Sequence, residues 1–278
     1  MKKITLLLIA LIATFKLNAT HITGGQISSR CLGGLTHEIT LTLFRDIQGV
    51  SMAPQIISYS ANTLTYNSFR TVAPGPPIPF NTTTEMYLFV DTVTFPYLDS
   101  YTISNSNCCR AATITNINNP ASTVLYLDLI VSISASCNST PLLPVNPYNP
   151  ISVSIPFIYA MTAIDPDGDS LSYSLVPPSD NASSPVSGFI LPSNMTISNN
   201  GILNWTPTFP GTYSICVKVD EYRNGNLIGY VRREMQINVG TFNSINELEI
   251  NKNSEYKNFY DLLGRKVNSN YNGFRIYE

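Results

Sequence analysis

Four acidic side chains are spaced as the oxygen ligands of a hard cation would be. Asp165, Asp167 and Asp169 alternate along an Asp-Pro-Asp-Gly-Asp segment whose glycine permits a sharp bend. Calcium takes roughly six to eight oxygen ligands, and Asp220 or Glu221 could complete the shell. We therefore predict a calcium site from Asp165, Asp167, Asp169 and Glu221. The alternative is a turn without a metal, because Asp, Pro and Gly each favour turns and the EF-hand pattern is absent.

Five cysteines form the second set of reactive groups. Cys108 and Cys109 are adjacent and could bridge each other only by distorting the peptide between them, so we expect each to pair with a distant cysteine. Cys31 and Cys137 are the candidate partners, and the odd count leaves at least one thiol unpaired. Cys216 is out of phase with the apolar side of its predicted strand. A zinc site is disfavoured, since the chain has no Cys-x-x-Cys pair and only two histidines.

The sequence offers no recognisable catalytic set. His21 and His37 are not near a Gly-x-Ser-x-Gly segment that could supply a nucleophile. Asp220 and Glu221 are adjacent on a predicted strand, so their carboxylates point to opposite faces and make a poor acid and base pair. We assign no catalytic residues and expect a protein that is not an enzyme.

The N-terminus has the features of a secretory signal peptide. Lys2 and Lys3 precede an apolar run from residue 4 to residue 15, and Ala19 ends a plausible cleavage motif. The apolar run has about 12 residues, whereas a membrane-spanning helix needs about 20, so we expect cleavage and no membrane span. The net charge of -2 gives no basic surface, which excludes a nucleic acid as partner.

The rest of the chain has the pattern of strands joined by polar turns. Charged residues make up only 12% of the sequence, and apolar residues alternate with polar ones over 38–44, 125–133, 213–219 and 235–239. A polar turn at 223–226 joins the last two runs into a hairpin. We predict an all-β fold with two β-sandwich domains, the second immunoglobulin- or cadherin-like, followed by a short C-terminal β tail.

Composition also predicts the boundaries of these units. Four prolines between residues 141 and 150 are typical of an extended linker. Trp205 is expected in the core of the domain that follows. The predicted units are a signal peptide at 1–19, an N-terminal β-sandwich domain at 20–140, a Pro-rich linker at 141–150, an immunoglobulin- or cadherin-like domain at 151–240 and a tail at 241–278.

A series of short motifs follows in order along residues 20–240. They are Thr20-His21-Ile22-Thr23-Gly24-Gly25, Cys31-Leu32-Gly33-Gly34, Arg45-Asp46, Cys108-Cys109-Arg110-Ala111-Ala112, Asp165-Pro166-Asp167-Gly168-Asp169 and Val219-Asp220-Glu221-Tyr222-Arg223. The series resembles a family of secreted, gliding-motility-associated surface proteins of Gram-negative bacteria. The resemblance implies a location more than an activity. In that family a cysteine tends to follow the Arg-Asp pair, where this chain has Ile47, which implies that Cys31 has lost its usual partner.

Two further stretches carry resemblances of their own. The acidic segment together with Trp205-Thr206-Pro207 and Gly211-Thr212-Tyr213 is similar to a cadherin-like or immunoglobulin-like domain. Residues 258–267 and 272–277 resemble the C-terminal sorting domain of the type IX secretion system, although the tail is short for one. That resemblance implies passage across the outer membrane.

Together these observations predict a secreted or cell-surface structural or adhesive protein of a Gram-negative bacterium. Its expected partners are a cell-surface protein or glycan and the type IX secretion machinery. The alternative is a glycan-binding surface module that uses some of the 16 tyrosines, which an exposed line of tyrosine side chains would favour.

Overall fold

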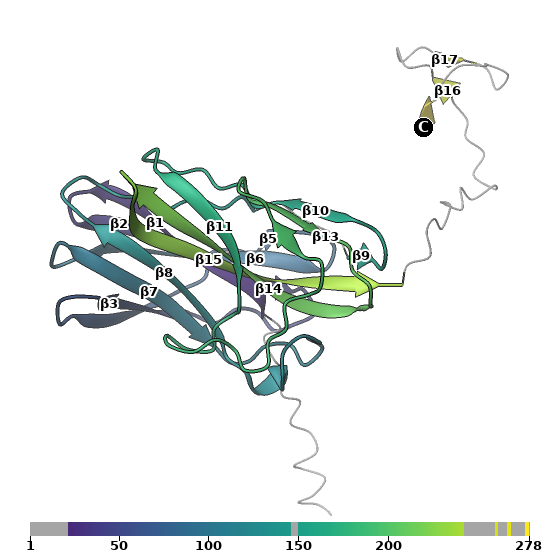
Figure 1. Cartoon of the computed structure of the whole chain (residues 1–278), viewed down its shortest axis with the longest axis horizontal. Coiled ribbons are helices and arrows are strands. Elements are labelled where there is room, and N and C mark those ends of the chain that lie inside the picture. The colour runs from purple at the N-terminus through teal and green to yellow at the C-terminus, as the bar shows by residue number, and fades with distance from the viewer. Residues whose placement is uncertain (1–21, 146–149, 242–258, 261–265, 268–275, 278) are drawn as a thin grey trace, which may run out of the picture. The chain divides into compact units, whose positions relative to one another are not determined.

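The structure is a computed structural model and describes residues 22–145, 150–241, 259–260, 266–267 and 276–277. The predicted signal peptide lies outside these residues. The chain divides into two compact units, Met1–Thr241 and Phe242–Glu278. In the described part of the first unit the regular elements are strands, apart from the short 3-10 helix η1 (Pro120–Ser122), which confirms the all-β class (Figure 1). None of the described segments is a helix with the length and hydropathy of a membrane span.

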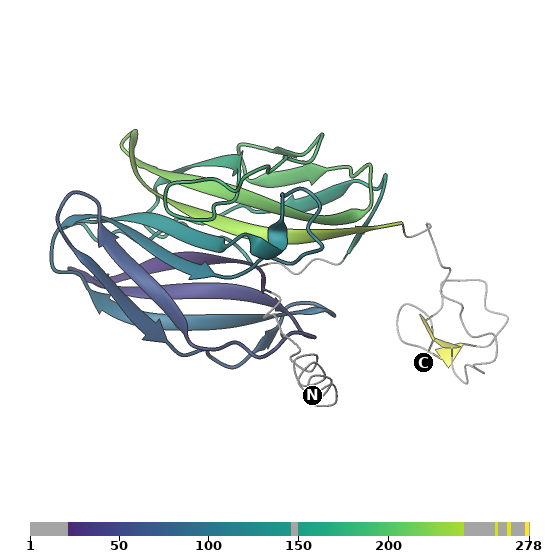
Figure 2. The same cartoon turned by 90° about the horizontal axis from the view of Figure 1, so that it is seen from below.

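The N-terminal part of this unit is a sandwich of two antiparallel layers (Figure 2). One layer contains, in order, β4 (Asn67–Val72), β3 (Gln55–Ala61), β7 (Asp99–Asn107) and β8 (Leu125–Ile133). The other contains β1 (Ile22–Gly33), β2 (Thr36–Asp46), β6 (Thr84–Thr94) and β5 (Ile78–Pro79). The predicted strand at 125–133 is confirmed, and its alternate leucine, valine and isoleucine side chains are buried in one core that also contains the apolar side chains of β2 and β6.

The immunoglobulin-like part follows with a longer hairpin. Its larger sheet contains β9 (Ile151–Ser152), β11 (Ser170–Val176), β14 (Gly211–Arg223) and β15 (Asn226–Gly240), and its smaller sheet contains β10 (Phe157–Ala160), β13 (Ile202–Trp205) and β12 (Thr196–Ile197). The predicted hairpin is confirmed, and Asn224 and Gly225 both have positive φ, as a tight two-residue turn requires. Trp205 is buried, as predicted, and its ring meets that of Tyr213 edge-on at 5.0 Å.

Strand β15 belongs to both parts. One edge pairs with β14, whereas the other edge pairs first with β8 at Tyr230 and Val231 and then with β1 at residues 233–235. The two sandwiches therefore share one sheet, and their buried apolar residues form one cluster. A side chain at Gly24 would overlap the backbone of Glu234, which explains why the Thr-Gly-Gly motif lies where β1 meets β15.

Residues 141–145 of the predicted linker pack within the first unit. Leu143 is buried, and Leu142 exchanges backbone hydrogen bonds with Ile164 at 2.9 and 3.1 Å. The guanidinium of Arg233 donates to the carbonyl of Pro144 at 2.5 Å. This segment thus contributes side chains and backbone groups to the packing of the unit.

In the second unit the structure describes only β16 (Phe259–Tyr260), β17 (Lys266–Val267) and β18 (Ile276–Tyr277). Both β17 and β18 pair antiparallel with β16. The rest of the predicted sorting tail lies outside the described residues.

Candidate cation site at the junction of the two sandwiches

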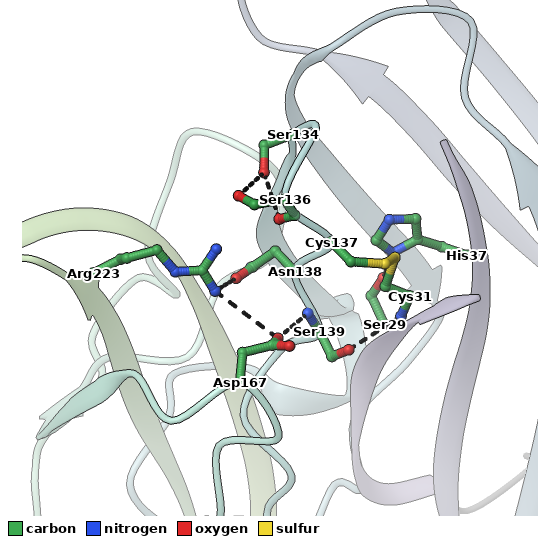
Figure 3. Close-up of a disulfide and its surroundings, with 10 residues drawn as sticks. All are labelled: Ser29, Cys31, His37, Ser134, Ser136, Cys137, Asn138, Ser139, Asp167 and Arg223. Carbon is green, nitrogen blue, oxygen red and sulfur yellow. Dashed lines mark hydrogen bonds and ion pairs between the residues drawn. A yellow bond between two sulfur atoms is a disulfide. The ribbon is translucent and has the colours of Figure 1, made fainter. Parts of the chain in front are cut away.

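A disulfide ties the first strand to the segment that leaves β8. Cys31 on β1 is bonded to Cys137, with the two Cα atoms 5.8 Å apart, a normal separation for a disulfide (Figure 3). The same segment is hydrogen-bonded to β1, because the backbone N–H of Cys31 donates to Ser139 Oγ at 3.2 Å and that of Ser29 donates to Thr140 Oγ1 at 2.9 Å. Residues 137–140 are therefore held on the N-terminal sandwich.

From this segment the contacts continue to the acidic loop of the immunoglobulin-like part. The backbone N–H of Ser139 donates to Asp167 Oδ2 at 2.6 Å, and Arg223 Nη2 donates to Asn138 Oδ1 at 2.5 Å (Figure 3). Arg223 also forms a bidentate ion pair with Asp169, in which its Nε donates to Oδ1 at 2.9 Å and its Nη2 donates to Oδ2 at 2.5 Å. The arginine at the end of β14 thus connects the acidic loop to the disulfide segment.

Three carboxylates lie close together near Arg223. One ligand oxygen from each of Asp165, Asp169 and Glu221 lies within 4.8 Å of the others. The loop is also the turn expected from its composition, since Asp165 Oδ1 accepts the backbone N–H groups of Asp167 and Asp169, each at 2.9 Å. Glu221 reaches the cluster from β14, where it faces Leu171 of β11.

Half of the cluster's oxygens have no partner of their own. Asp165 Oδ2 and both carboxylate oxygens of Glu221 are buried and accept no hydrogen bond from the described residues, and the amide nitrogen of Asn138 is likewise buried without an acceptor. This amide lies near enough to Glu221 to lower the pKa of its carboxyl, against the larger effect of burial. The Glu221 side chain is fully buried, whereas the adjacent Asp220 points to the other face and pairs with Lys218 at 2.7 Å. A buried ionised carboxylate is costly without a compensating partner, so this site calls for a proton or a cation.

The pKa values of the three carboxyl groups differ in the same way between those with and those without hydrogen-bond partners. Burial and, to a smaller extent, the neighbouring Asp165 carboxylate together raise the pKa of Glu221 to about 8. Burial also raises the pKa of Asp165. Hydrogen bonds from Arg223 instead lower the pKa of Asp169, which stays ionised. Arg223 therefore neutralises Asp169, whereas Asp165 and Glu221 have no counter-charge.

The donor set fits calcium in type and in spacing. Two ligands at the usual calcium–oxygen distance can lie up to about 5 Å apart on one ion, and the three carboxylates meet that limit. Of the four predicted ligands, the structure brings together Asp165, Asp169 and Glu221, while Asp167 turns toward Ser139 and Arg223. Sequence reasoning did not find Asn138, whose position beside Arg223 depends on the disulfide segment.

Comparison with known proteins covers this part of the chain. Residues 135–227 match the family model described as "Putative Ig domain" (He_PIG). The immunoglobulin-like character predicted for the second region is thereby confirmed. The match contains Cys137, the acidic loop, Glu221 and Arg223, so all the groups of the candidate site except Cys31 fall within it. No curated protein and no solved structure matches the chain.

The four predicted disulfide cysteines are all oxidised, but one pairing prediction is wrong. Cys108 is bonded to Cys109. Their peptide bond is cis and their Cα atoms are 3.0 Å apart. Cys31 is bonded to Cys137, another of the four candidate cysteines. Cys216 is a buried free thiol, and burial raises its pKa to about 12.

Proposed function

We propose that this protein is an exported structural or adhesive module of a Gram-negative cell surface and not an enzyme. The observation that best supports the proposal is the way the immunoglobulin-like part is joined to its neighbour. Strand β15 runs through both parts, and the Cys31–Cys137 bond closes a loop of 106 residues at the other side of the junction. Such a body resists separation of its parts and presents loops at its ends, as surface sandwiches do.

Export agrees with the chemistry of the cysteines. Disulfides persist in oxidising compartments, where the N-terminal leader would deliver the chain. The family resemblance and the C-terminal tail suggest type IX secretion as the route to the surface. In this proposal residues 241–278 are the sorting signal, and residues up to 240 carry out the structural or adhesive role.

Fractionation of the producing cell tests the route. Intact-mass analysis should find the mature protein without residues 1–19 at the surface or in the medium, whereas a variant truncated after Gly240 should stay in the periplasm. If both forms are found in the same compartment, the C-terminal tail is not a sorting signal, and the proposed surface role loses the support that the tail gives it.

We propose further that Asp165, Asp169 and Glu221 bind one calcium ion. The ion would neutralise the two carboxylates that Arg223 does not reach, and so fix the acidic loop to the end of β14. Through Arg223 and Asn138 the loop is connected to the disulfide segment. Bound calcium would thus stiffen the junction of the sandwiches.

Thermal unfolding in calcium and in chelator tests this site. A ligand that binds only the folded state at 100 times its Kd adds about 2.7 kcal/mol. We expect calcium to raise the Tm of the mature protein and of Asp220→Asn, which changes the adjacent carboxylate on the other face of β14. Glu221→Gln should abolish the rise. An equal rise in both variants would show that calcium acts elsewhere.

Glycan binding is the second candidate function. Among the described tyrosines only Tyr97 is strongly exposed, so the tyrosine line that would favour this function is not found there. Beside the buried Trp205, however, the ring of Phe209 is 70% exposed. This observation keeps the glycan hypothesis open.

A further inference from the structure

A groove lies on the immunoglobulin-like part, away from the acidic cluster in sequence and in its lining. Its volume is about 310 Å³, and its walls come from residues 190–193, from the segment that joins β13 to β14 and from residues 115–116. The groove is therefore assembled from three separate stretches of chain. Neither the calcium site nor the β15 junction uses it.

The floor and one wall of the groove are aromatic. The buried Trp205 meets the ring of Tyr213 edge-on at 5.0 Å, and Phe209 projects beyond them with 70% of its surface exposed. Tyr213 donates its hydroxyl to the carbonyl of Phe209 at 3.1 Å, which fixes the turn that carries the phenyl ring. Ile190 faces solvent to a similar extent, at 70%. The apolar surface is thus rigid and open.

The opposite wall is rigid for a different reason. Asn116 donates to the carbonyls of Ile190 at 3.0 Å and Ser214 at 2.8 Å, and accepts the backbone N–H of Ser214 at 2.9 Å. Its buried amide therefore ties the 190–193 loop to β14. A ligand would find this groove already formed.

The polar groups of the groove are hydroxyls and amides, and none of its lining residues is charged. Ser193 and Thr208 line the groove with hydroxyls, and Thr115, whose hydroxyl donates to the carbonyl of Thr212 at 3.0 Å, can still accept a hydrogen bond there. An ionic ligand would have no counter-charge here, whereas a large apolar partner would leave these polar groups without partners.

We propose that this groove binds a neutral saccharide. A sugar ring has an apolar C–H face, which can lie on the aromatic surface, and an equatorial rim of hydroxyls, which can pair with the threonine and serine side chains. The inference rests on the proposed surface role and specifies what an adhesive module of this kind would hold. Phe209 is its exposed contact, and Trp205 is its floor.

Two measurements on the mature protein test the proposal together. The first is binding to a microarray of neutral and acidic oligosaccharides. The second is titration of the strongest neutral oligosaccharide while tryptophan emission is recorded. Trp205 is the only tryptophan of the chain, so a change in emission reports on this groove. We expect selective binding of neutral glycans with a shift in emission.

Phe209→Ala should weaken binding at least tenfold, since an exposed side chain can be removed without a core cavity. Phe69→Ala is the matched control, because Phe69 is 71% exposed on β4 and lines no part of the groove. Binding that is equal in the two variants, a preference for acidic glycans, or no binding to any neutral glycan on the array would overturn the inference.

Self-association through Phe209, measured by sedimentation of the wild type and Phe209→Ala, would overturn it as well. None of these results bears on export, which the fractionation experiment decides separately. A protein that reaches the surface yet ignores neutral glycans would therefore refute the groove and leave the surface role standing.

Discussion

Two buried glutamates on neighbouring strands have opposite surroundings. Glu234 of β15 receives Arg110 Nε at 2.8 Å on one oxygen and Arg110 Nη2 at 2.7 Å on the other, and Ser214 Oγ donates to it at 2.8 Å. Glu221 of β14 is equally buried and receives no hydrogen bond from the described residues. The same side chain is thus fully paired in one place and left with open oxygens in the other.

The difference separates a structural ion pair from a ligand site. Arg110 also donates to the backbone carbonyls of Val124 and Ser179, so both partners of the pair with Glu234 are satisfied within the fold. Burial of such a pair needs these extra hydrogen bonds to offset the loss of hydration. Around Glu221 the nearest cation, Arg223, is occupied by Asp169 and Asn138. The open oxygens of Glu221 call for a proton or a cation, and our proposal assigns them calcium.

Breaking the Arg110–Glu234 pair should have the largest effect. Removing one partner of a buried pair costs about 3–5 kcal/mol, because the other charge is left alone in the interior. Arg110→Met should therefore lower the free energy of unfolding by about that amount in denaturant titrations. Arg223→Met should cost less, since Arg223 is about a quarter exposed and water can replace it. Equal losses would end the distinction between the two sites.

Removing the Cys31–Cys137 bond should come next. A disulfide that closes a loop of this length contributes about 2–5 kcal/mol. In the double variant Cys31→Ser/Cys137→Ser we expect weaker calcium binding as well, because residues 137–140 no longer hold Arg223 and Asp167 in place. The Arg110–Glu234 pair should persist, which retained burial of Cys216 would report. Unchanged calcium binding would show that the disulfide segment does not position the acidic loop.

The pH dependence of stability should follow Glu221 in the metal-free protein. Its folded pKa, about 8, lies above its unfolded value near 4.5, so the folded state holds the proton over that interval while the unfolded state releases it. Stability should therefore fall as pH rises, by about 2 kcal/mol between pH 6 and pH 8. Calcium or Glu221→Gln should flatten this slope in denaturant titrations. The lowered pKa of Asp169 acts only in more acidic solution and leaves this window unaffected.

The smallest effect should be seen at Cys216, which lies opposite Glu234 on β14. With its pKa raised to about 12, the thiol stays protonated at neutral pH and hardly reacts. Native protein should resist iodoacetamide, as intact mass would show, whereas Arg110→Met should be labelled faster because the segment that covers the thiol loosens. Rapid labelling of the wild type would mean that this face is open.

Local sequence pattern predicted the strands at 38–44, 125–133, 213–219 and 235–239 and all three carboxylates that the structure brings together, because alternation and turn chemistry act over a few residues. It could not predict the Arg110–Glu234 pair, whose members are 124 residues apart. Cys216 is on the polar side of β14 in sequence, yet it is buried, and Asn116 from a distant segment is hydrogen-bonded to the backbone of Ser214 two residues away. Segments far from Glu221 in sequence also bury its side chain, and no local pattern reveals this burial.

Calcium titration by calorimetry tests the central claim most directly. The mature protein is compared with Glu221→Gln and with Glu234→Gln, each first shown to be folded by circular dichroism. The account predicts one bound calcium ion in the wild type and in Glu234→Gln, which is less stable but keeps its ligands, and none in Glu221→Gln. Binding that survives Glu221→Gln, or no binding to the wild type, would contradict it.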